Sequence, residues 1–167
     1  DEEDDDLSFS ISSEELVITS EGVLTFVSAP DFEAKSSYTT TITVSDGINE
    51  ATQDISVNVT NVNDVAPVFT SSATFSAAEN QTAIDTVTAT DADGDSVTFT
   101  ISGSELAITS AGVLTFKAAP DYETKSQYTA TVTASDGTNS TTQDITVNVT
   151  NVNDGPPVFT SSATFSA

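Results

Sequence analysis

The chain has 167 residues, contains no cysteine, histidine, methionine or tryptophan, and carries a formal net charge of −23 from 26 acidic residues and three lysines. These absences exclude disulfides, zinc sites made of Cys and His, and catalysis by thiol or imidazole groups. The charge argues against binding to nucleic acid or anionic lipid, because both need a basic protein surface.

The first six residues, from Asp1 to Asp6, are all acidic. This is not the pattern of a signal peptide, and no stretch approaches the ~20 apolar residues of a membrane span. We therefore expect no membrane insertion of this sequence and interpret it as a piece of a longer protein.

The sequence repeats itself at an offset of 90 residues (112 − 22). Residues 22–26 return as residues 112–116, and residues 67–77 return unchanged as residues 157–167. Self-similarity of this kind indicates tandem structural units. We predict a first repeat over 1–64 that lacks the counterpart of 65–90, a complete repeat over 65–154, and the first strand of a third repeat over 155–167.

Within the complete repeat, apolar residues alternate with threonine and serine, which is the pattern of half-buried strands. The expected inward rows are Val97, Phe99 and Ile101, then Tyr128, Ala130, Val132 and Ala134, then Ile145, Val147 and Val149. About seven short strands separated by turns are typical of a two-sheet sandwich. We predict an all-β fold of tandem Greek-key β-sandwiches, with Tyr38, Tyr128 and the phenylalanines in the cores.

Amide and carboxylate side chains gather between the repeats, as Asn-Val-Asn-Asp at residues 61–64 and again at 151–154. Four more acidic motifs precede the second of these. They are Glu79 after the first expected strand, Asp91-Ala92-Asp93, Asp121-Tyr122-Glu123, and Ala134-Ser135-Asp136-Gly137.

These motifs, in this order, resemble the calcium motifs of cadherin repeats, which are a lone Glu, DxD, DRE, AxDxG and the linker DxNDN. The resemblance covers residues 65–154 and the surviving part of the first repeat. It implies Ca²⁺ at the junctions between consecutive repeats. One junction would use Asp31, Glu33, Asn61, Asn63, Asp64, Asp91, Asp93 and Asp136. Glu79, Asp121, Glu123, Asn151, Asn153 and Asp154 would form half of the next, with backbone carbonyls near Val62 and Val152 completing the two sets.

The donor types agree with this, because calcium prefers 6–8 oxygens from carboxylates, amides and carbonyls. Two departures from the cadherin linker lower the expected affinity or number of ions: Asn61 and Asn151 replace its first Asp, and Val65 and Gly155 replace its last Asn.

A simpler interpretation exists for each motif. Asp46-Gly47 and Asp136-Gly137 are common hairpin-turn dipeptides, and Asp91 to Asp95 is also readable as a solvated acidic turn. Asn61 and Asn63 are frequent turn formers. The calcium hypothesis depends on the motifs occurring together and in order.

Acidic, cysteine-free repeats this alike resemble the extender regions of large bacterial surface adhesins of the RTX type. The resemblance implies an extracellular spacer in cell adhesion, stiffened by calcium, with neighbouring repeats of the same chain as partners. Head-to-tail self-association through the free strand from Pro157 to Ala167 is a further hypothesis. The alternative function is a carbohydrate-binding cadherin-like module. We do not expect an enzyme, because a small sandwich without tryptophan or a predicted long cleft is a poor catalytic scaffold.

Overall fold

The structure is a computed structural model that describes residues 6–160, and the chain divides into two compact units, one up to Asp64 and one from Val65 onward. Every regular element in the described residues is a β-strand. No described segment forms a helix that is long and apolar enough to cross a membrane. The all-β prediction is confirmed.

The first unit contains five strands in its described part. They are β1 (Ser8–Ile11), β2 (Leu16–Ile18), β3 (Leu24–Phe26), β4 (Ser37–Ser45) and β5 (Glu50–Asn58). β1, β4 and β5 form one sheet in that order, and β2 pairs with β3 in a second, two-stranded sheet.

The second unit has nine strands in the part of the chain that the structure describes. They are β6 (Val68–Phe69), β7 (Thr74–Ala78), β8 (Ala83–Thr86), β9 (Ala89–Thr90), β10 (Thr98–Ile101), β11 (Leu106–Ile108), β12 (Val113–Phe116), β13 (Gln127–Ser135) and β14 (Ser140–Thr150). One sheet has the order β10-β13-β14-β7, a second has the order β11-β12-β8, and β6 pairs with β9.

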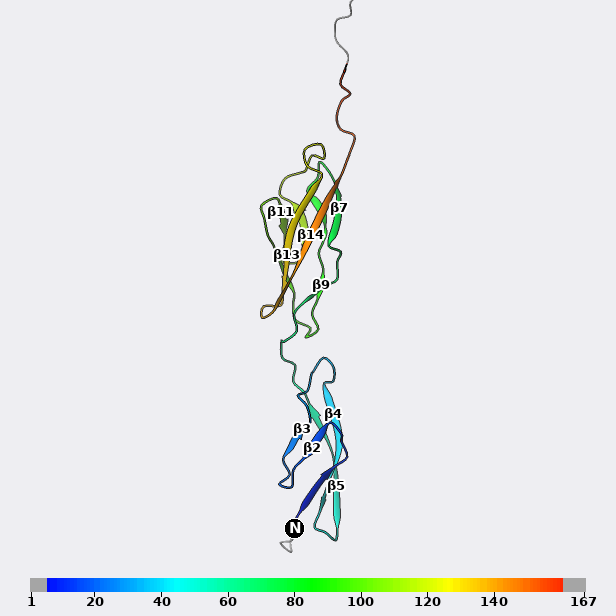
Figure 1. Ribbon diagram of the computed structural model, residues 1–167, viewed down its shortest axis with the longest axis vertical. Coiled ribbons are helices and arrows are strands. Elements are labelled where there is room, and N and C mark those ends of the chain that lie inside the picture. The colour runs from blue at the N-terminus through cyan, green and yellow to red at the C-terminus, as the bar shows by residue number, and fades with distance from the viewer. Residues whose placement is uncertain (1–5, 161–167) are drawn as a thin grey trace, which may run out of the picture. The chain divides into compact units, whose positions relative to one another are not determined.

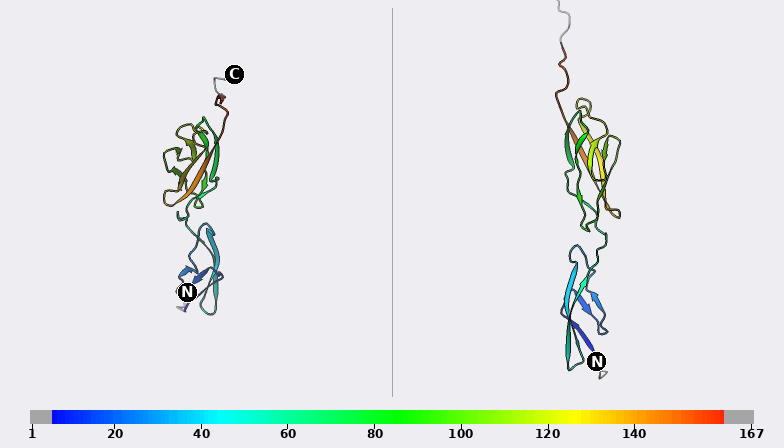
Figure 2. Two further views of the ribbon diagram at one scale, coloured as in Figure 1. Left: turned by 45° about the horizontal axis from the view of Figure 1, so that its top comes forward. Right: turned by 180° about the vertical axis from the view of Figure 1, so that it is seen from behind.

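The long hairpin of β13 and β14 forms the centre of the larger sheet. Its register pairs Gln127 with Asn148 at one end and Ser135 with Ser140 at the other. Figure 1 shows β14 between β13 and β7, and Figure 2 shows the same sheet from behind. β7 runs parallel to β14, with Thr74 opposite Thr146 and Ala78 opposite Thr150.

The two main sheets of the second unit pack face to face over one hydrophobic core. Val132 and Val147 from the larger sheet are fully buried, and they belong to the same core as Leu106, Leu114 and Phe116 from the smaller sheet. The inward rows expected from the alternation therefore face the core, as predicted. Burial of these apolar side chains is the main stabilising contribution of a sandwich this size.

The structure differs from the expected seven strands because two of them are divided. The first strand pairs as β6 with β9, breaks at residues 70–73, and continues as β7 beside β14. The second strand is divided into β8 and β9 by residues 87–88, because β8 pairs with β12 and β9 with β6. Each division marks the point where a strand changes its partner.

The core of the first unit is less completely covered. Ile55 and Val57 on β5 are half-buried, whereas their counterparts Ile145 and Val147 on β14 are buried. β5 is an edge strand of its sheet in the described residues, while β14 is covered by β7. The edge position of β5 in the described residues explains its lower burial.

The aromatic prediction holds for most residues and is wrong for one. Phe26 packs edge-on against Tyr38, and Phe116 against Tyr128, with ring centroids 5.1 and 5.0 Å apart. Phe159, however, is 94% exposed. It lies in residues 156–160, which form no strand, and residues 161–167 lie outside the described part, so the third repeat stays a prediction.

Candidate metal centre

The second unit brings three of the predicted ligands together at one end. Glu79 lies directly after β7 and is 3% exposed, while Asp121 and Glu123 are exposed in the loop between β12 and β13. Carboxylate oxygens of all three lie within 4.8 Å of one another. Such a cluster repels itself unless a proton or cation neutralises it.

Glu79 is fixed by two short hydrogen bonds from the backbone. The N–H of Tyr122 donates to Oε2 and the N–H of Val152 donates to Oε1, both at 2.7 Å. Bonds of this kind satisfy both oxygens of a buried carboxylate without a basic side chain. The same bonds tie the loop of Asp121 and Glu123 to the residues that follow β14.

The linker residues 151–154 line the hollow next to this cluster. The Asn151 side-chain amide donates to Glu123 Oε1 at 2.7 Å. A hollow of about 400 Å³ is lined by Glu123, Asn151, Val152, Asn153, Asp154 and Gly155. Four of the six residues predicted for this half-junction therefore line the hollow, together with Val152, whose carbonyl was the expected backbone donor. The other two, Glu79 and Asp121, cluster with Glu123.

Asp121 accepts a 2.8 Å hydrogen bond from the Thr124 hydroxyl and a 3.2 Å hydrogen bond from the backbone N–H of Thr124. These bonds lower the pKa of the Asp121 carboxyl below its ordinary value, the hydroxyl having the larger effect. Asp121 is therefore anionic at neutral pH, as a calcium ligand must be.

A second acidic cluster lies in the loop after β9. Carboxylate oxygens of Asp91, Asp93 and Asp95 lie within 4.8 Å of one another. Asp91 Oδ2 is buried and accepts no hydrogen bond, while Asp91 Oδ1 accepts one from the N–H of Asp95 at 3.3 Å. A buried carboxylate oxygen without a donor is costly, and a cation would satisfy it.

The Asp93 carboxylate is tied to the start of the second unit. The N–H of Val65 donates to its Oδ2 at 3.0 Å. Val65 is the residue directly after Asp64, the last residue of the linker motif.

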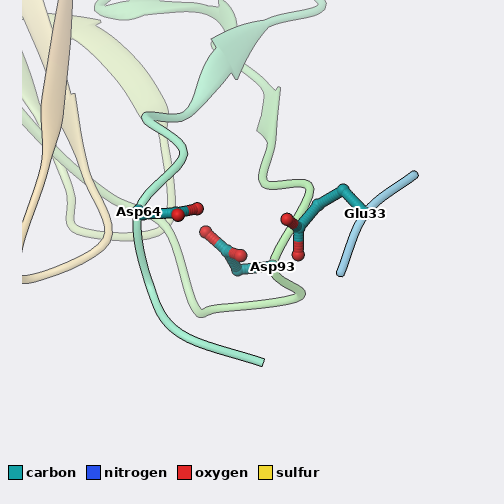
Figure 3. A group of neighbouring side chains, drawn as sticks. All are labelled: Glu33, Asp64 and Asp93. Atoms are coloured by element: carbon teal, nitrogen blue, oxygen red, sulfur yellow. The ribbon is translucent and has the colours of Figure 1, made fainter. Parts of the chain in front are cut away.

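In the first unit, Glu33 and Asp64 have carboxylate oxygens within 4.8 Å of each other. Figure 3 draws the side chains of Glu33 and Asp64 as sticks. Asp31, two residues before Glu33, accepts the N–H groups of Glu33 and Ala34 at 3.0 and 3.2 Å. Its carboxylate thus shapes the loop that presents Glu33.

The remaining predicted ligands of this junction lie in the linker and in a hairpin turn. Asn61, Val62 and Asn63 follow β5, and Val62 is 65% exposed. Asp136 closes the turn between β13 and β14, where its Oδ1 accepts the N–H groups of Thr138 and Asn139 at 2.7 and 2.6 Å. The turn interpretation describes what Asp136 does in this structure, and its role as a ligand stays a prediction.

Two polar residues of these clusters are absent from the predicted ligand set. Asp95 completes the group of Asp91 and Asp93, and its position two residues further on was a visible signal. Asn80 donates from its side-chain amide to Asp154 Oδ2 at 2.6 Å. No local pattern reveals a contact across 74 residues.

The donor set fits calcium. The clustered side chains offer only carboxylate and amide oxygens, without sulfur or imidazole, and hard oxygen donors in flexible arrangements suit Ca²⁺ better than zinc or copper. The buried Asp91 Oδ2 is the observation that most directly calls for a cation.

Comparison with known proteins identifies both the family and the fold. A sequence profile described as bacterial Ig domain matches residues 63–150. The chain is 32% identical over 161 residues to the protocadherin-like wing polarity protein stan of Drosophila melanogaster, a match that covers 84% of this chain and 4% of that protein.

Two solved structures also resemble this chain. The extracellular cadherin domains 3–6 of protocadherin gamma B2 match with a TM-score of 0.78 and 25% identity, covering 89% of this chain and 42% of that one. The protocadherin gammaB7 EC3–6 cis-dimer structure matches with a TM-score of 0.77 and 28% identity, covering 89% and 43%. The predicted cadherin-like fold is thereby confirmed, and the chain corresponds to a small part of its much longer curated relatives.

Proposed function

Because the chain belongs to the bacterial Ig domain family and consists of cadherin-like repeats, we propose that it is a calcium-stiffened spacer of a secreted or cell-surface adhesin. Its repeats would hold a distal binding domain away from the surface that carries them. An extracellular location accords with the solved relatives, which are extracellular cadherin domains. Cadherin repeats are not enzymes, in agreement with the expectation that this chain has no catalytic activity.

The acidic clusters are the observation that carries the proposal. Glu79, Asp121 and Glu123 form one cluster at the end of the second unit, and Asp91, Asp93 and Asp95 form another beside the start of that unit. A spacer needs fixed angles between its repeats, and linkers of a few residues do not fix them. Calcium bound by two consecutive repeats would supply the missing restraint.

At the first junction, Glu33, Asp64, Asp91 and Asp93 would supply the negative charge. Asp31, Asn61, Asn63, Asp136 and the carbonyl near Val62 would add oxygen donors. At the next junction, Glu79, Asp121, Glu123 and Asp154 would supply the charge, with Asn151, Asn153 and the carbonyl near Val152. When bound, calcium neutralises these carboxylates and cross-links the segments that carry them.

The close similarity of successive repeats supports a bacterial surface adhesin as the source. Residues 67–77 and 157–167 are the same, residue for residue. A spacer gains length from copies of one unit, whereas a series of distinct recognition domains has no reason to keep identical sequences. This choice of source is part of the proposal.

Calcium titration of the whole chain tests the proposal. We expect several ions to bind by calorimetry, and chelator to change the small-angle scattering profile and lower the melting temperature. Asp64→Ala should weaken binding about tenfold or more, since loss of metal-site residues commonly costs 10–100-fold. Thr142→Ala, on an exposed position of β14, is the matched control. Identical scattering profiles with calcium and with chelator would refute the spacer mechanism.

A carbohydrate-binding module is the competing function. Sugar-binding surfaces commonly use exposed aromatic rings. In the described residues Phe75, Phe99 and Phe116 are buried, and the exposed aromatic residues are Tyr122 and Phe159. This burial favours the spacer. Retention of the chain on a polysaccharide affinity gel, unchanged by chelator, would favour the competitor.

Head-to-tail association through the segment from Pro157 to Ala167 is a second proposal, supported by the pairing of β7. β7 runs parallel to β14, and β5 is the counterpart of β14 with an edge position in its sheet. Residues 164–167 have the sequence of Thr74 to Ala77 but lie outside the described residues. By the offset of 90, Thr164 of one copy would lie opposite Ser56 of another.

An engineered cysteine pair tests this association, because the chain has no cysteine of its own. Ser56→Cys with Thr164→Cys should form disulfide-linked oligomers under oxidising conditions. Thr74→Cys with Thr146→Cys, at the matching register within the second unit, should link within one chain and is the positive control. A strictly monomeric Ser56→Cys, Thr164→Cys variant, alongside a linked control, would discard the idea.

A further inference from the structure

The segment directly after β7 contacts two parts of the second unit that are distant in sequence. The N–H of Glu79 donates to the carbonyl of Thr150 at 3.1 Å, which extends the pairing of β7 with β14. Its carboxylate accepts the N–H of Tyr122 and of Val152. The next residue, Asn80, continues this set of contacts in a different way.

Asn80 bonds to both of these parts at once. Its N–H donates to the carbonyl of Pro120 at 3.0 Å, beside Asp121, and its side-chain amide donates to Asp154 Oδ2 at 2.6 Å. Asp154 is the last residue of the linker motif, so this bond ties the end of the linker to the end of β7.

The backbone of Asn80 is in the left-handed region, with φ of 63°. It is the one described residue other than glycine with a positive φ. This conformation is unfavourable for a residue with a side chain, although Asn tolerates it better than most. A strained backbone persists when the surrounding contacts compensate for it, and the bonds to Pro120 and Asp154 are such contacts.

We propose that Asn80 is a positioning residue for the metal centre at the end of the second unit. Its left-handed backbone directs the amide toward Asp154, and this bond holds linker residues 151–154 against the cluster of Glu79, Asp121 and Glu123 before any cation is bound. The inference rests on the proposed calcium site, but its first consequence concerns the calcium-free protein.

The electrostatics explain why such a residue is needed. Without a cation, Asp154 is repelled by three neighbouring carboxylates, and the linker would move away from them. The Asn80 amide offers a donor without adding charge. A linker that is already in place loses less conformational entropy when calcium binds, so the affinity is higher.

Two substitutions distinguish the effect of the Asn80 side-chain amide from the effect of its backbone conformation. Asn80→Gly keeps the left-handed conformation without strain and removes only the side-chain donor. Asn80→Ala removes the donor and also disfavours the conformation. If Asn80 were only a turn former, the glycine variant would behave like the wild type and the alanine variant alone would be affected.

The primary readout is amide hydrogen exchange of the full chain in chelator, followed by NMR. In Asn80→Gly we expect the Val152 N–H to exchange about fivefold faster, the factor for a hydrogen bond worth about 1 kcal/mol. The N–H groups of residues 61–64, in the equivalent linker of the first unit, should be unchanged and serve as the internal control. Unchanged exchange at Val152 in Asn80→Gly would overturn the inference.

Calcium titration of the same proteins is the second readout. We expect Asn80→Gly to bind calcium at the end of the second unit about fivefold more weakly, by the same hydrogen-bond factor, with Thr142→Ala equal to the wild type. Wild-type affinity in Asn80→Gly would refute the positioning role. If the wild type bound no calcium while Val152 still exchanged faster in Asn80→Gly, the calcium proposal would fail and the contact of Asn80 with the linker would stand.

Discussion

Asp46 shows how one carboxylate shapes a hairpin in the first unit. It closes the turn between β4 and β5, where its Oδ1 accepts the N–H groups of Ile48 and Asn49 at 2.8 and 2.7 Å. These bonds, the one from Asn49 first, lower the pKa of the Asp46 carboxyl below its ordinary value of 3.8. The folded chain therefore favours the ionised form.

A lowered pKa in the folded state determines how the stability of the protein changes with pH. Asp46 stabilises the fold at pH values above 3.8, and this contribution is lost as the pH falls through its lower value in the folded state. A carboxyl NMR titration in chelator should give a midpoint below 3.8 for Asp46. Asn49→Ala, which removes the side-chain donor, should raise that midpoint, and a wild-type midpoint at or above 3.8 would contradict the expectation.

Lys125 makes two contacts that Lys35 repeats in the first unit. Its ammonium group lies 2.6 Å from Glu105 Oε1 and 4.4 Å from the ring centroid of Tyr128. Lys35 contacts Glu15 and the ring of Tyr38 in the same way. An exposed ion pair and a cation–π contact each contribute up to about 1 kcal/mol.

Lys125→Ala should therefore lower the free energy of unfolding by about 1 kcal/mol in urea titrations. Part of this difference should disappear at high salt, since the ion pair is exposed to solvent. Lys117→Ala is the control and should change stability by less than about 0.5 kcal/mol. Equal effects of the two substitutions would show that the contacts of Lys125 do not stabilise the unit.

At the scale of elements, Gly112 lets the turn before β12 pack directly against Val87, which follows β8. Its φ is +88°, and a Cβ at this position would lie 2.1 Å from the carbonyl oxygen of Val87. Val87 in turn donates its N–H to the carbonyl of Gly112 at 2.8 Å. The turn before β12 is therefore built around a backbone contact that no side chain fits.

Gly112→Ala should destabilise the chain more than Gly103→Ala. Gly103 has a similar φ of +84°, but no atom lies within 4 Å of the position that a Cβ would take, so its substitution carries only the backbone cost of roughly 1–2 kcal/mol. The clash with Val87 adds about 1–3 kcal/mol more. Urea unfolding of both variants measures the difference, and equal losses would contradict it.

The regular elements were predictable because their signal is local. The alternation along β13 and β14 reports which side chains are buried, and the Asp-Gly turns mark the hairpins. The division of the first strand into β6 and β7 was not predictable, because it depends on two partners, β9 and β14, that follow it in the chain. The sequence of a single strand does not identify the strand with which it pairs.

The candidate site was likewise predictable only in part. The resemblance of the acidic motifs to those of cadherins pointed to Glu79, Asp121 and Glu123, which the structure brings together. The spacing of these residues did not reveal that Glu79 would be buried under two backbone N–H groups, or that Asn80 would hold Asp154. Those contacts arise only when β7, the loop after β12 and the linker meet.

For the whole molecule, the net charge of −23 is the dominant electrostatic feature. Self-repulsion of this size destabilises a folded chain. Monovalent salt screens it without binding at specific positions, whereas calcium would remove it where the carboxylates cluster.

Calcium should therefore stabilise the chain more than sodium does at matched ionic strength. Each ion at a hundred times its Kd contributes about 2.7 kcal/mol, which predicts a rise in melting temperature of roughly 10–20 °C for a repeat of about 90 residues. Calorimetric melts in CaCl₂, NaCl and MgCl₂, each against chelator, make the comparison. Equal stabilisation by all three salts would show screening alone.

The parallel pairing of β7 with β14 has a consequence for how the second unit responds to a pulling force. In the second unit the first strand continues from Thr74 as β7, the last strand ends at Thr150, and these two lie side by side along five residue pairs. A pull on the two ends slides one strand along the other, so the hydrogen bonds between them share the tension and break together instead of opening one after another. Such a unit resists unfolding under a pulling force, whatever its thermal stability.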